Sequence, residues 1–180
     1  MKFKEIIKPS LILFIICLLT TVALAGTNLL TEQKIKQQEE ENARKTQAQV
    51  LPTANVFEEK EDYVEGKNEN GEAVGYVFTT SAKGYGGEIS VMTGVSSDGK
   101  ITGVAILSHG ETPGLGANAA KEEFTKQYIG NDAEKGVSVT KNAPKEGEIV
   151  AVTSATISSK AVTSAVNEAL ESYEKIKGGI

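Results

Sequence analysis

The sequence contains few of the residues that carry chemistry by themselves. Its 180 residues include one cysteine, one histidine, four prolines and no tryptophan. One cysteine excludes an internal disulfide and any paired-cysteine zinc or redox motif, and one histidine excludes a multi-histidine metal cage. We therefore expect no metal site, and any chemistry has to come from a bound group.

Charge is distributed unevenly along the chain. The 19 Lys and Arg residues against 24 Asp and Glu residues give a net charge of −5. Residues 1–25 contain three lysines against one glutamate, which is +2 and leaves −7 for residues 26–180. An acidic body without a clustered basic stripe has no long-range attraction for phosphate backbones, so nucleic-acid binding is disfavoured.

A long uncharged segment follows the basic amino terminus. Residues 10–31 contain no charged side chain, and about 20 helical residues span a hydrocarbon core of about 30 Å. We expect a cytoplasmic end at residues 1–9 and a transmembrane helix at residues 10–30, a single-pass anchor in the cell membrane. The alternative is a secretory signal cleaved after Ala23-Leu24-Ala25, but the uncharged run continues past this point and favours the anchor. Either hypothesis puts the rest of the chain on the extracytoplasmic side.

The segment after the anchor is polar. Residues 31–56 are rich in Gln, Glu and Lys and have almost no apolar face, which indicates a helical stalk or linker. The exported domain is then expected at residues 57–180. Its acidic first part, residues 57–70, is most economically a solvated loop with a short strand around Tyr63 and Val64.

Alternation of apolar and polar residues predicts a β-meander followed by a long helix. The expected strands cover residues 73–78, 88–95, 100–107, 136–140 and 149–152, and the expected helices begin at Ala117 and cover residues 157–176. Asp98-Gly99 between two strands is a strong hairpin signal. The apolar residues from Ile157 to Ile176 follow the three-to-four spacing of one buried stripe. The predicted fold class is α+β, an antiparallel sheet packed with helices and preceded by one transmembrane helix.

Three segments stand apart from these patterns. Residues 81–87 hold three glycines in four positions, residues 107–116 form a loop rich in Gly and Pro, and residues 152–160 hold five hydroxyl side chains at a strand-to-helix junction. Residue types alone favour a glycine-rich turn for the first and a polar surface loop for the second. The third is either an N-cap of the following helix or, since helix amino termini attract anions, a phosphate site.

Together the three segments resemble the FMN-binding domain of the G subunit of the Rnf electron transport complex. The matching motifs are Gly-Tyr-Gly-Gly at residues 84–87, Glu-Thr-Pro-Gly-Leu-Gly at residues 111–116 and Thr-Ser-Ala-Thr at residues 153–156. They occur in the order of the family, after a short basic end and one apolar segment. The resemblance covers nearly the whole chain.

The resemblance implies a covalently bound cofactor. In the family the last Thr of the third motif, here Thr156, is joined through its hydroxyl to the phosphate of FMN, by a separate flavin transferase. Tyr85 is expected to stack on the isoalloxazine ring, with Thr112, Pro113 and Leu115 along its edge. The full implied cofactor-binding set is Thr156, Ser154, Ala155, Gly84, Tyr85, Gly86, Glu111, Thr112, Pro113, Gly114 and Leu115.

One position departs from the family pattern. The family motif usually begins with Asp six residues before the modified Thr, where this sequence has Val150. If the transferase recognises that acidic residue, modification of this chain is slower or partial, or nearby Glu148 takes the place of the missing Asp. Thr156 remains the expected attachment site.

The implied function is electron relay through FMN in a membrane complex that couples ferredoxin:NAD⁺ electron transfer to Na⁺ or H⁺ translocation. The implied partners are the other membrane subunits and the flavin transferase, and no catalytic acid, base or nucleophile is required. Three alternatives stay open. They are the C subunit of a sodium-pumping NADH:quinone reductase, a stand-alone exported FMN-binding reductase domain, and a structural interaction domain in which the hydroxyl-rich junction only caps a helix.

Overall fold

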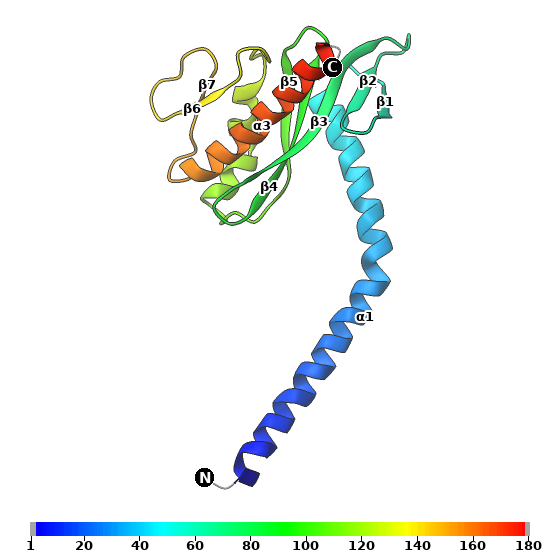
Figure 1. Cartoon of the computed structure of the whole chain (residues 1–180), viewed down its shortest axis with the longest axis vertical. Coiled ribbons are helices and arrows are strands. Elements are labelled where there is room, and N and C mark those ends of the chain that lie inside the picture. The colour runs from blue at the N-terminus through cyan, green and yellow to red at the C-terminus, as the bar shows by residue number, and fades with distance from the viewer. Residues whose placement is uncertain (1–2, 179–180) are drawn as a thin grey trace. The chain divides into compact units, whose positions relative to one another are not determined.

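The computed structural model describes residues 3–178 and begins with one long helix, α1 (Phe3–Val50; Figure 1). From Ile7 onward this helix is long and apolar enough to cross a membrane. Its large apolar side chains between Leu11 and Leu30 are 45–84% exposed, an amount of apolar surface that is unusual for a helix in water. The chain divides into two compact units, Met1–Asn42 and Ala43–Ile180. The four-segment organisation expected from the sequence stays a prediction.

The second unit is built on a five-stranded antiparallel meander. Its strands lie side by side in chain order: β1 (Val56–Glu59), β2 (Val64–Lys67), β3 (Ala73–Lys83), β4 (Glu88–Ser96) and β5 (Ile101–His109). The predicted hairpin turn is present, with Gly99 at a φ of 84° and a 2.8 Å hydrogen bond from the Ser96 N–H to the Lys100 carbonyl. The prediction of an α+β fold with an antiparallel sheet is confirmed.

The β1–β2 hairpin occupies the acidic stretch for which the sequence predicted mainly a loop. Lysines offset the glutamates across the hairpin, since the Lys67 ammonium lies 2.8 Å from a carboxylate oxygen of Glu58. Phe57 packs against apolar residues of the sheet, and Tyr63 meets the ring of Tyr76 on β3 at a centroid distance of 5.6 Å. Ion pairing and aromatic contacts therefore stabilise strands that composition alone did not indicate.

Helix α3 (Thr156–Lys177) covers one face of the sheet and packs against β3 and β4 (Figure 1). Most of the predicted apolar stripe is buried against the sheet: Ala161, Val162, Ala165, Val166, Ala169, Leu170 and Tyr173. Ile157 is the exception, because it is 55% exposed at the amino end of the helix. The prediction that Ile157 belongs to the buried stripe is therefore wrong.

The opposite face of the sheet contacts the last turn of α1. Val50 and Leu51 are buried there with Val77 and Met92. A Cβ on Gly94 or on the glycine at position 103 would overlap the Val50 backbone, so the sheet carries glycine where this turn crosses it.

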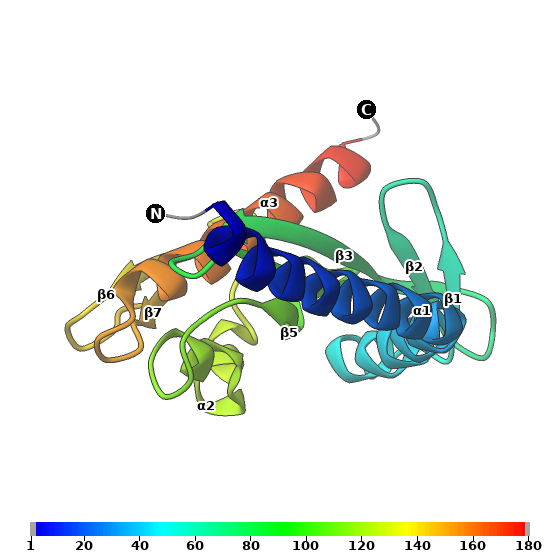
Figure 2. The same cartoon turned by 90° about the horizontal axis from the view of Figure 1, so that it is seen from below.

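The remaining elements are short. The helix expected from Ala117 is instead a 3-10 helix, η1 (Gly116–Ala120), and a short α2 (Glu122–Thr125), divided by the extended backbone of Lys121 and followed by η2 (Lys126–Tyr128). Strands β6 (Ser138–Thr140) and β7 (Glu148–Val150) form a separate parallel pair beside the amino-terminal half of α3 (Figure 2).

Candidate functional site

The three segments that the sequence singled out meet at one pocket of about 460 Å³ at the amino end of α3. Small-molecule sites have volumes of roughly 300–1,000 Å³. Among the expected residues, the pocket is lined by Tyr85, Glu111, Thr112, Leu115, Ser154, Ala155 and Thr156. The structure therefore brings residues 156 and 85 to one concave site although 71 positions separate them in the printed sequence.

The pocket also differs in detail from the expected set. It adds Gly116, Ile157 and Ser158, which sequence reasoning did not name as site residues. Gly116 ends the second motif, and Ile157 and Ser158 lie in the hydroxyl-rich segment, so membership of these segments was their only signal. Of the expected residues in the part of the chain that the structure describes, Gly84, Gly86, Pro113 and Gly114 are outside this lining. Gly114, at a φ of 79°, instead lines a neighbouring pocket of about 540 Å³.

Glu111 connects the parts of the pocket. Its side chain is only 7% exposed, although it begins a loop. One carboxylate oxygen, Oε1, accepts hydrogen bonds from the backbone N–H groups of Tyr85 and Gly86, at 2.8 and 3.0 Å. The other, Oε2, accepts one from the Ser158 hydroxyl in the first turn of α3, at 2.7 Å.

Glycines surround this carboxylate because there is no space for a side chain. A Cβ on Gly84 would overlap Oε1 of Glu111, and a Cβ on Gly116 would overlap Oε2. Gly86 packs against the carbonyl of Gly110, which joins the two loops backbone to backbone. Close packing at Glu111 and its loop thus explains Gly84, Gly86 and Gly116, whereas Gly87 and Gly114 have open space around them and positive φ.

Glu111 is held in its ionised form. Burial by itself raises the pKa of this carboxyl, but the hydrogen bonds from the Ser158 hydroxyl and from two backbone N–H groups outweigh burial. The resulting pKa lies below the ordinary value of 4.5. The pocket therefore has a buried negative charge in its wall at neutral pH.

The hydroxyl-rich junction does not cap α3, so the N-cap interpretation is wrong. The N-cap residue is Ala155, and no side chain of the described residues forms a cap hydrogen bond there. The Ser159 hydroxyl accepts from the Val152 N–H and donates to the Ala155 carbonyl, and Ser158 donates to Glu111. The amino end of α3 is left open toward the pocket, with its N–H groups available to an anion.

Thr156 is the first residue of this helix. Within residues 3–178, no hydrogen bond is formed by the Thr156 hydroxyl, which lines the pocket and is partly exposed. Ser154, two residues earlier, has a φ of 62°, and it is the one non-glycine residue with positive φ in the described chain. This left-handed turn is where the chain leaves the preceding segment and enters the helix.

Val150, the position that departs from the family pattern, lies on β7 with a fixed backbone. Its N–H donates to the Gln127 side-chain carbonyl at 2.8 Å, and its carbonyl accepts from the Gln127 amide at 3.4 Å. Val150 lines the neighbouring pocket together with Gly114, Leu115 and Ser154. Sequence reasoning did not identify Gln127, since nothing in its local pattern indicated a contact 23 residues away.

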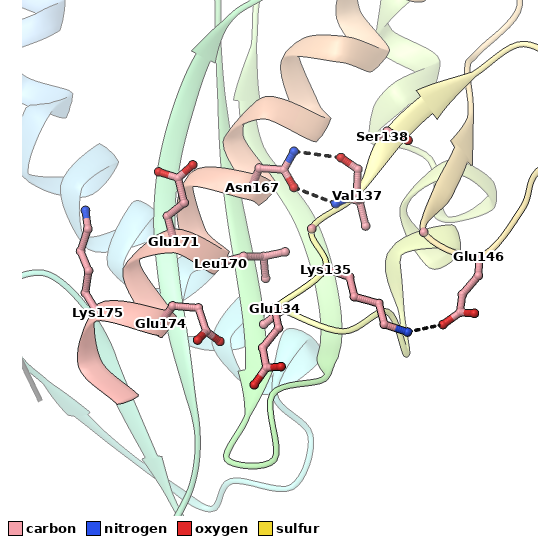
Figure 3. A pocket seen from close by; sticks show the side chains of 13 residues that line it. Glu134, Lys135, Val137, Ser138, Glu146, Asn167, Leu170, Glu171, Glu174 and Lys175 are labelled. Carbon is pink, nitrogen blue, oxygen red and sulfur yellow. Dashed lines mark hydrogen bonds and ion pairs between the residues drawn. The ribbon is translucent and has the colours of Figure 1, made fainter. Parts of the chain in front are cut away.

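A larger pocket of about 780 Å³ lies elsewhere, between α3 and the loops around β6 and β7 (Figure 3). Its charged side chains are Glu134, Glu146, Glu171, Glu174, Lys135 and Lys175. In the wall of this pocket, the Asn167 side chain forms two 2.9 Å hydrogen bonds with the Val137 backbone, and Lys135 forms an ion pair with Glu146 at 2.8 Å. The lining contains none of the motif residues, and its charges are largely solvated, so the smaller pocket is the better candidate site.

Two family models match the chain. Residues 84–171 match the FMN-binding domain, and residues 1–50 match the RnfG N-terminal region. Together these matches cover the apolar helix and all three motif segments.

Full-length relatives give the same result. The G subunit of the Na⁺-translocating ferredoxin:NAD⁺ oxidoreductase complex of Acetobacterium woodii is 39% identical, over 97% of this chain and 94% of its own length. The G subunit of the proton-translocating ferredoxin:NAD⁺ oxidoreductase complex of Clostridium ljungdahlii is 35% identical, over 93% of this chain and 91% of its own.

Solved structures share the fold. The C subunit of the Na⁺-translocating NADH-quinone reductase of Parabacteroides distasonis has a TM-score of 0.53 and 28% identity. That match covers 63% of this chain and 61% of the other. NqrC of Shewanella oneidensis has a TM-score of 0.55 at 21% identity, with 66% of each chain covered, and indicates the fold alone.

Proposed function

Because the chain belongs to the family of G subunits of ion-translocating, Rnf-type oxidoreductase complexes, we propose that it relays electrons through FMN attached covalently at Thr156. The observation that carries the proposal is the open amino end of α3, where a threonine hydroxyl without a hydrogen-bond partner among the described residues faces a pocket of about 460 Å³. The rest of the complex would supply the electron donor, the acceptor and the ion pathway.

The residues present fit FMN. A phosphate bonded to Thr156 would lie against the first N–H groups of α3, where the helix dipole favours negative charge. This arrangement needs no basic cluster, which suits the acidic domain. Tyr85 and Ile157, 75% and 55% exposed at the pocket, offer apolar surface to a flat ring.

The attachment is a phosphoryl transfer to the Thr156 oxygen. The donor that balances the reaction is a flavin phosphoanhydride held by the transferase. The bond between the Thr156 oxygen and the flavin phosphorus forms, the anhydride bond breaks, a nucleotide leaves, and the hydroxyl proton passes to a base or to water. The left-handed turn at Ser154 presents this hydroxyl at the pocket rim.

When bound, FMN supplies the redox chemistry, and the protein binds, orients and tunes it. The chain contributes a fixed attachment point at Thr156 and a wall formed by Tyr85, Thr112 and Leu115. Covalent attachment also suits the proposed extracytoplasmic location, where a dissociated cofactor is not readily recaptured. In this proposal α1 is the retained membrane anchor, its lysine-containing end lies in the cytoplasm, and the other membrane subunits of the complex are the partners.

The alternatives make different predictions. A structural interaction domain would use the hydroxyl-rich junction to cap α3, but no side chain in the described part of the molecule does so. A stand-alone reductase would transfer electrons without membrane partners. A C subunit of a NADH-quinone reductase shares the fold, but the family model at residues 1–50 is that of RnfG.

Peptide mass analysis tests the attachment. The full chain is expressed in a host containing the flavin transferase, and the peptide spanning Thr156 is expected to carry the mass of FMN. Thr156→Ala should abolish flavin fluorescence in denaturing gels. Thr153→Ala is the matched control, because Thr153 lies at the same junction and its exposed hydroxyl likewise has no hydrogen bond within the described residues. Undiminished flavin in Thr156→Ala, or unmodified wild-type peptide, would overturn the proposal.

A further inference from the structure

Glu111 is placed to do more than line the pocket. Its carboxylate receives three hydrogen bonds from two distant parts of the chain, two from the Tyr85–Gly86 backbone and one from Ser158. The bond to Ser158 spans 47 residues of sequence. One side chain thus fixes both the loop that carries Tyr85 and the first turn of the helix that carries Thr156.

The charge of this carboxylate is not neutralised by a basic side chain. No Lys or Arg within residues 7–178 forms an ion pair with Glu111; the ionised carboxylate is stabilised mainly by three hydrogen-bond donors and, to a smaller extent, by the charge of His109. The residue is also 7% exposed, so water screens the charge poorly. A fixed negative charge in such surroundings acts strongly on any neighbouring group that gains or loses an electron.

We propose that Glu111 is a positioning residue of the flavin site, which clamps the Tyr85–Gly86 segment to the first turn of α3 and lowers the reduction potential of the flavin through its buried negative charge. The clamp follows from the contacts of this chain. The effect on the potential rests on the proposed function, since it requires FMN in the pocket that Glu111 lines.

Three substitutions separate the clamp from the charge. Glu111→Gln keeps an acceptor for the Tyr85 and Gly86 N–H groups and offers an amide N–H to the Ser158 oxygen, but it removes the charge. Glu111→Ala removes both. Glu88→Gln is the matched control, because Glu88 follows the same glycine-rich loop but is exposed, and among the described residues its side chain bonds only to the Ser81 hydroxyl.

The clamp is tested by hydrogen exchange on the full chain with Thr156→Ala, so that no flavin is attached. Adding Glu111→Ala is expected to speed exchange of the Tyr85 and Gly86 amides on the order of tenfold or more. Glu88→Gln should leave these amides unchanged. Unchanged exchange of these amides in Glu111→Ala would overturn the clamp. If that variant is globally unfolded, two milder variants decide the same point. The Tyr85 and Gly86 amides should stay protected in Glu111→Gln and exchange faster in Ser158→Ala.

The charge is tested by redox titration of the flavin-loaded full chain. The midpoint potential of Glu111→Gln is expected to shift to a more positive value, while that of Glu88→Gln stays at the wild-type value. Equal potentials in Glu111→Gln and Glu88→Gln would overturn the electrostatic role. A wild-type chain without flavin would instead refute the proposed function and with it the effect on the potential, while the exchange experiment would still decide the clamp.

Discussion

The two ends of α3 differ in how fully their polar groups are hydrogen-bonded and their apolar side chains are buried. At the amino end the helix has no side-chain cap from the described residues, Ser154 has a left-handed backbone, and Ile157 is exposed. At the carboxyl end Tyr173 is 1% exposed, its ring lies 5.9 Å from that of Tyr76, and its hydroxyl donates to the Ser97 carbonyl. Lys175 and the lysine at position 177 also complement the helix dipole in the last turn.

Along this one helix, the carboxyl end contributes to stability and the amino end is the proposed place of ligand binding. The carboxyl end follows the rules of a stable core, while the amino end leaves donors and apolar surface open where a ligand is proposed to bind. Open or strained groups of this kind persist only when the surrounding structure holds them in place. Packing of the rest of α3 against β3 and β4 provides that support.

The largest expected effect is at the packed end. Tyr173→Ala should reduce the free energy of unfolding by about 3–5 kcal/mol, because it leaves a cavity beneath the helix. Tyr173→Phe removes only the hydrogen bond to Ser97 and should cost about 1 kcal/mol. Denaturant unfolding of the full chain in detergent measures both, and flavin content per folded molecule should not change. Equal stabilities of the two variants would contradict the contrast between the ends.

The core contains a buried threonine hydroxyl that a substitution can replace with an apolar group. Thr93 on β4 is fully buried, and within the described residues its hydroxyl has no hydrogen-bond partner. Thr93→Val should therefore increase stability by about 1–2 kcal/mol. Thr80→Val is the control of opposite sign, since the Thr80 hydroxyl donates to the Ala165 carbonyl at 2.8 Å. A loss of stability in Thr93→Val would indicate that the hydroxyl has a partner such as buried water.

A smaller gain is expected at the open end. Ser154→Gly should stabilise the chain by about 1 kcal/mol, because glycine adopts positive φ without strain, an effect partly offset by its greater unfolded-state entropy. Thr153→Gly lies next to it at a φ that is not positive and should destabilise the chain. Thermal unfolding of both variants provides the test. A destabilised Ser154→Gly would refute strain at this turn.

The smallest effect depends on pH. The pKa of Glu111 is below its ordinary value of 4.5 because donors hold the ionised form, so this group contributes stability above that value and the contribution is lost as the pH falls through the folded-state pKa. The free energy of unfolding should therefore be larger for wild type than for Glu111→Gln at pH 7. This difference between the two proteins should become smaller below about pH 4.5. Unfolding curves at pH 7, 5, 4 and 3 measure the difference. A difference that widens on acidification would contradict the predicted sign.

Sequence reasoning succeeded where structure is determined locally. The Asp98-Gly99 turn and the α3 stripe were predictable because turn chemistry and helical spacing act over a few residues. The β1–β2 hairpin was mainly missed, since its strands depend on cross-strand pairs such as Lys67 with Glu58. The helix expected at Ala117 failed because the backbone is extended at Lys121.

The candidate site shows the same limit. The motifs identified its segments, and the resemblance identified a cofactor for them. The side-chain roles were not predictable, because the Glu111 carboxylate meets a hydroxyl that lies 47 residues further along the chain. The three-to-four spacing predicts Ile157 in the core, but at the amino end of α3 this side chain lines the pocket and is 55% exposed.

The long-range bond between Glu111 and Ser158 also has a consequence for the order of events during synthesis. The chain emerges from the ribosome amino terminus first, so the Tyr85 loop and Glu111 are made well before the start of α3. Their clamp is incomplete until Ser158 is present, and α3 is joined to the sheet partly through the Ala165 carbonyl. In the proposed attachment, an enzyme that recognises the assembled pocket would meet its acceptor only after the first turn of α3 has been made, and modification would then report correct folding.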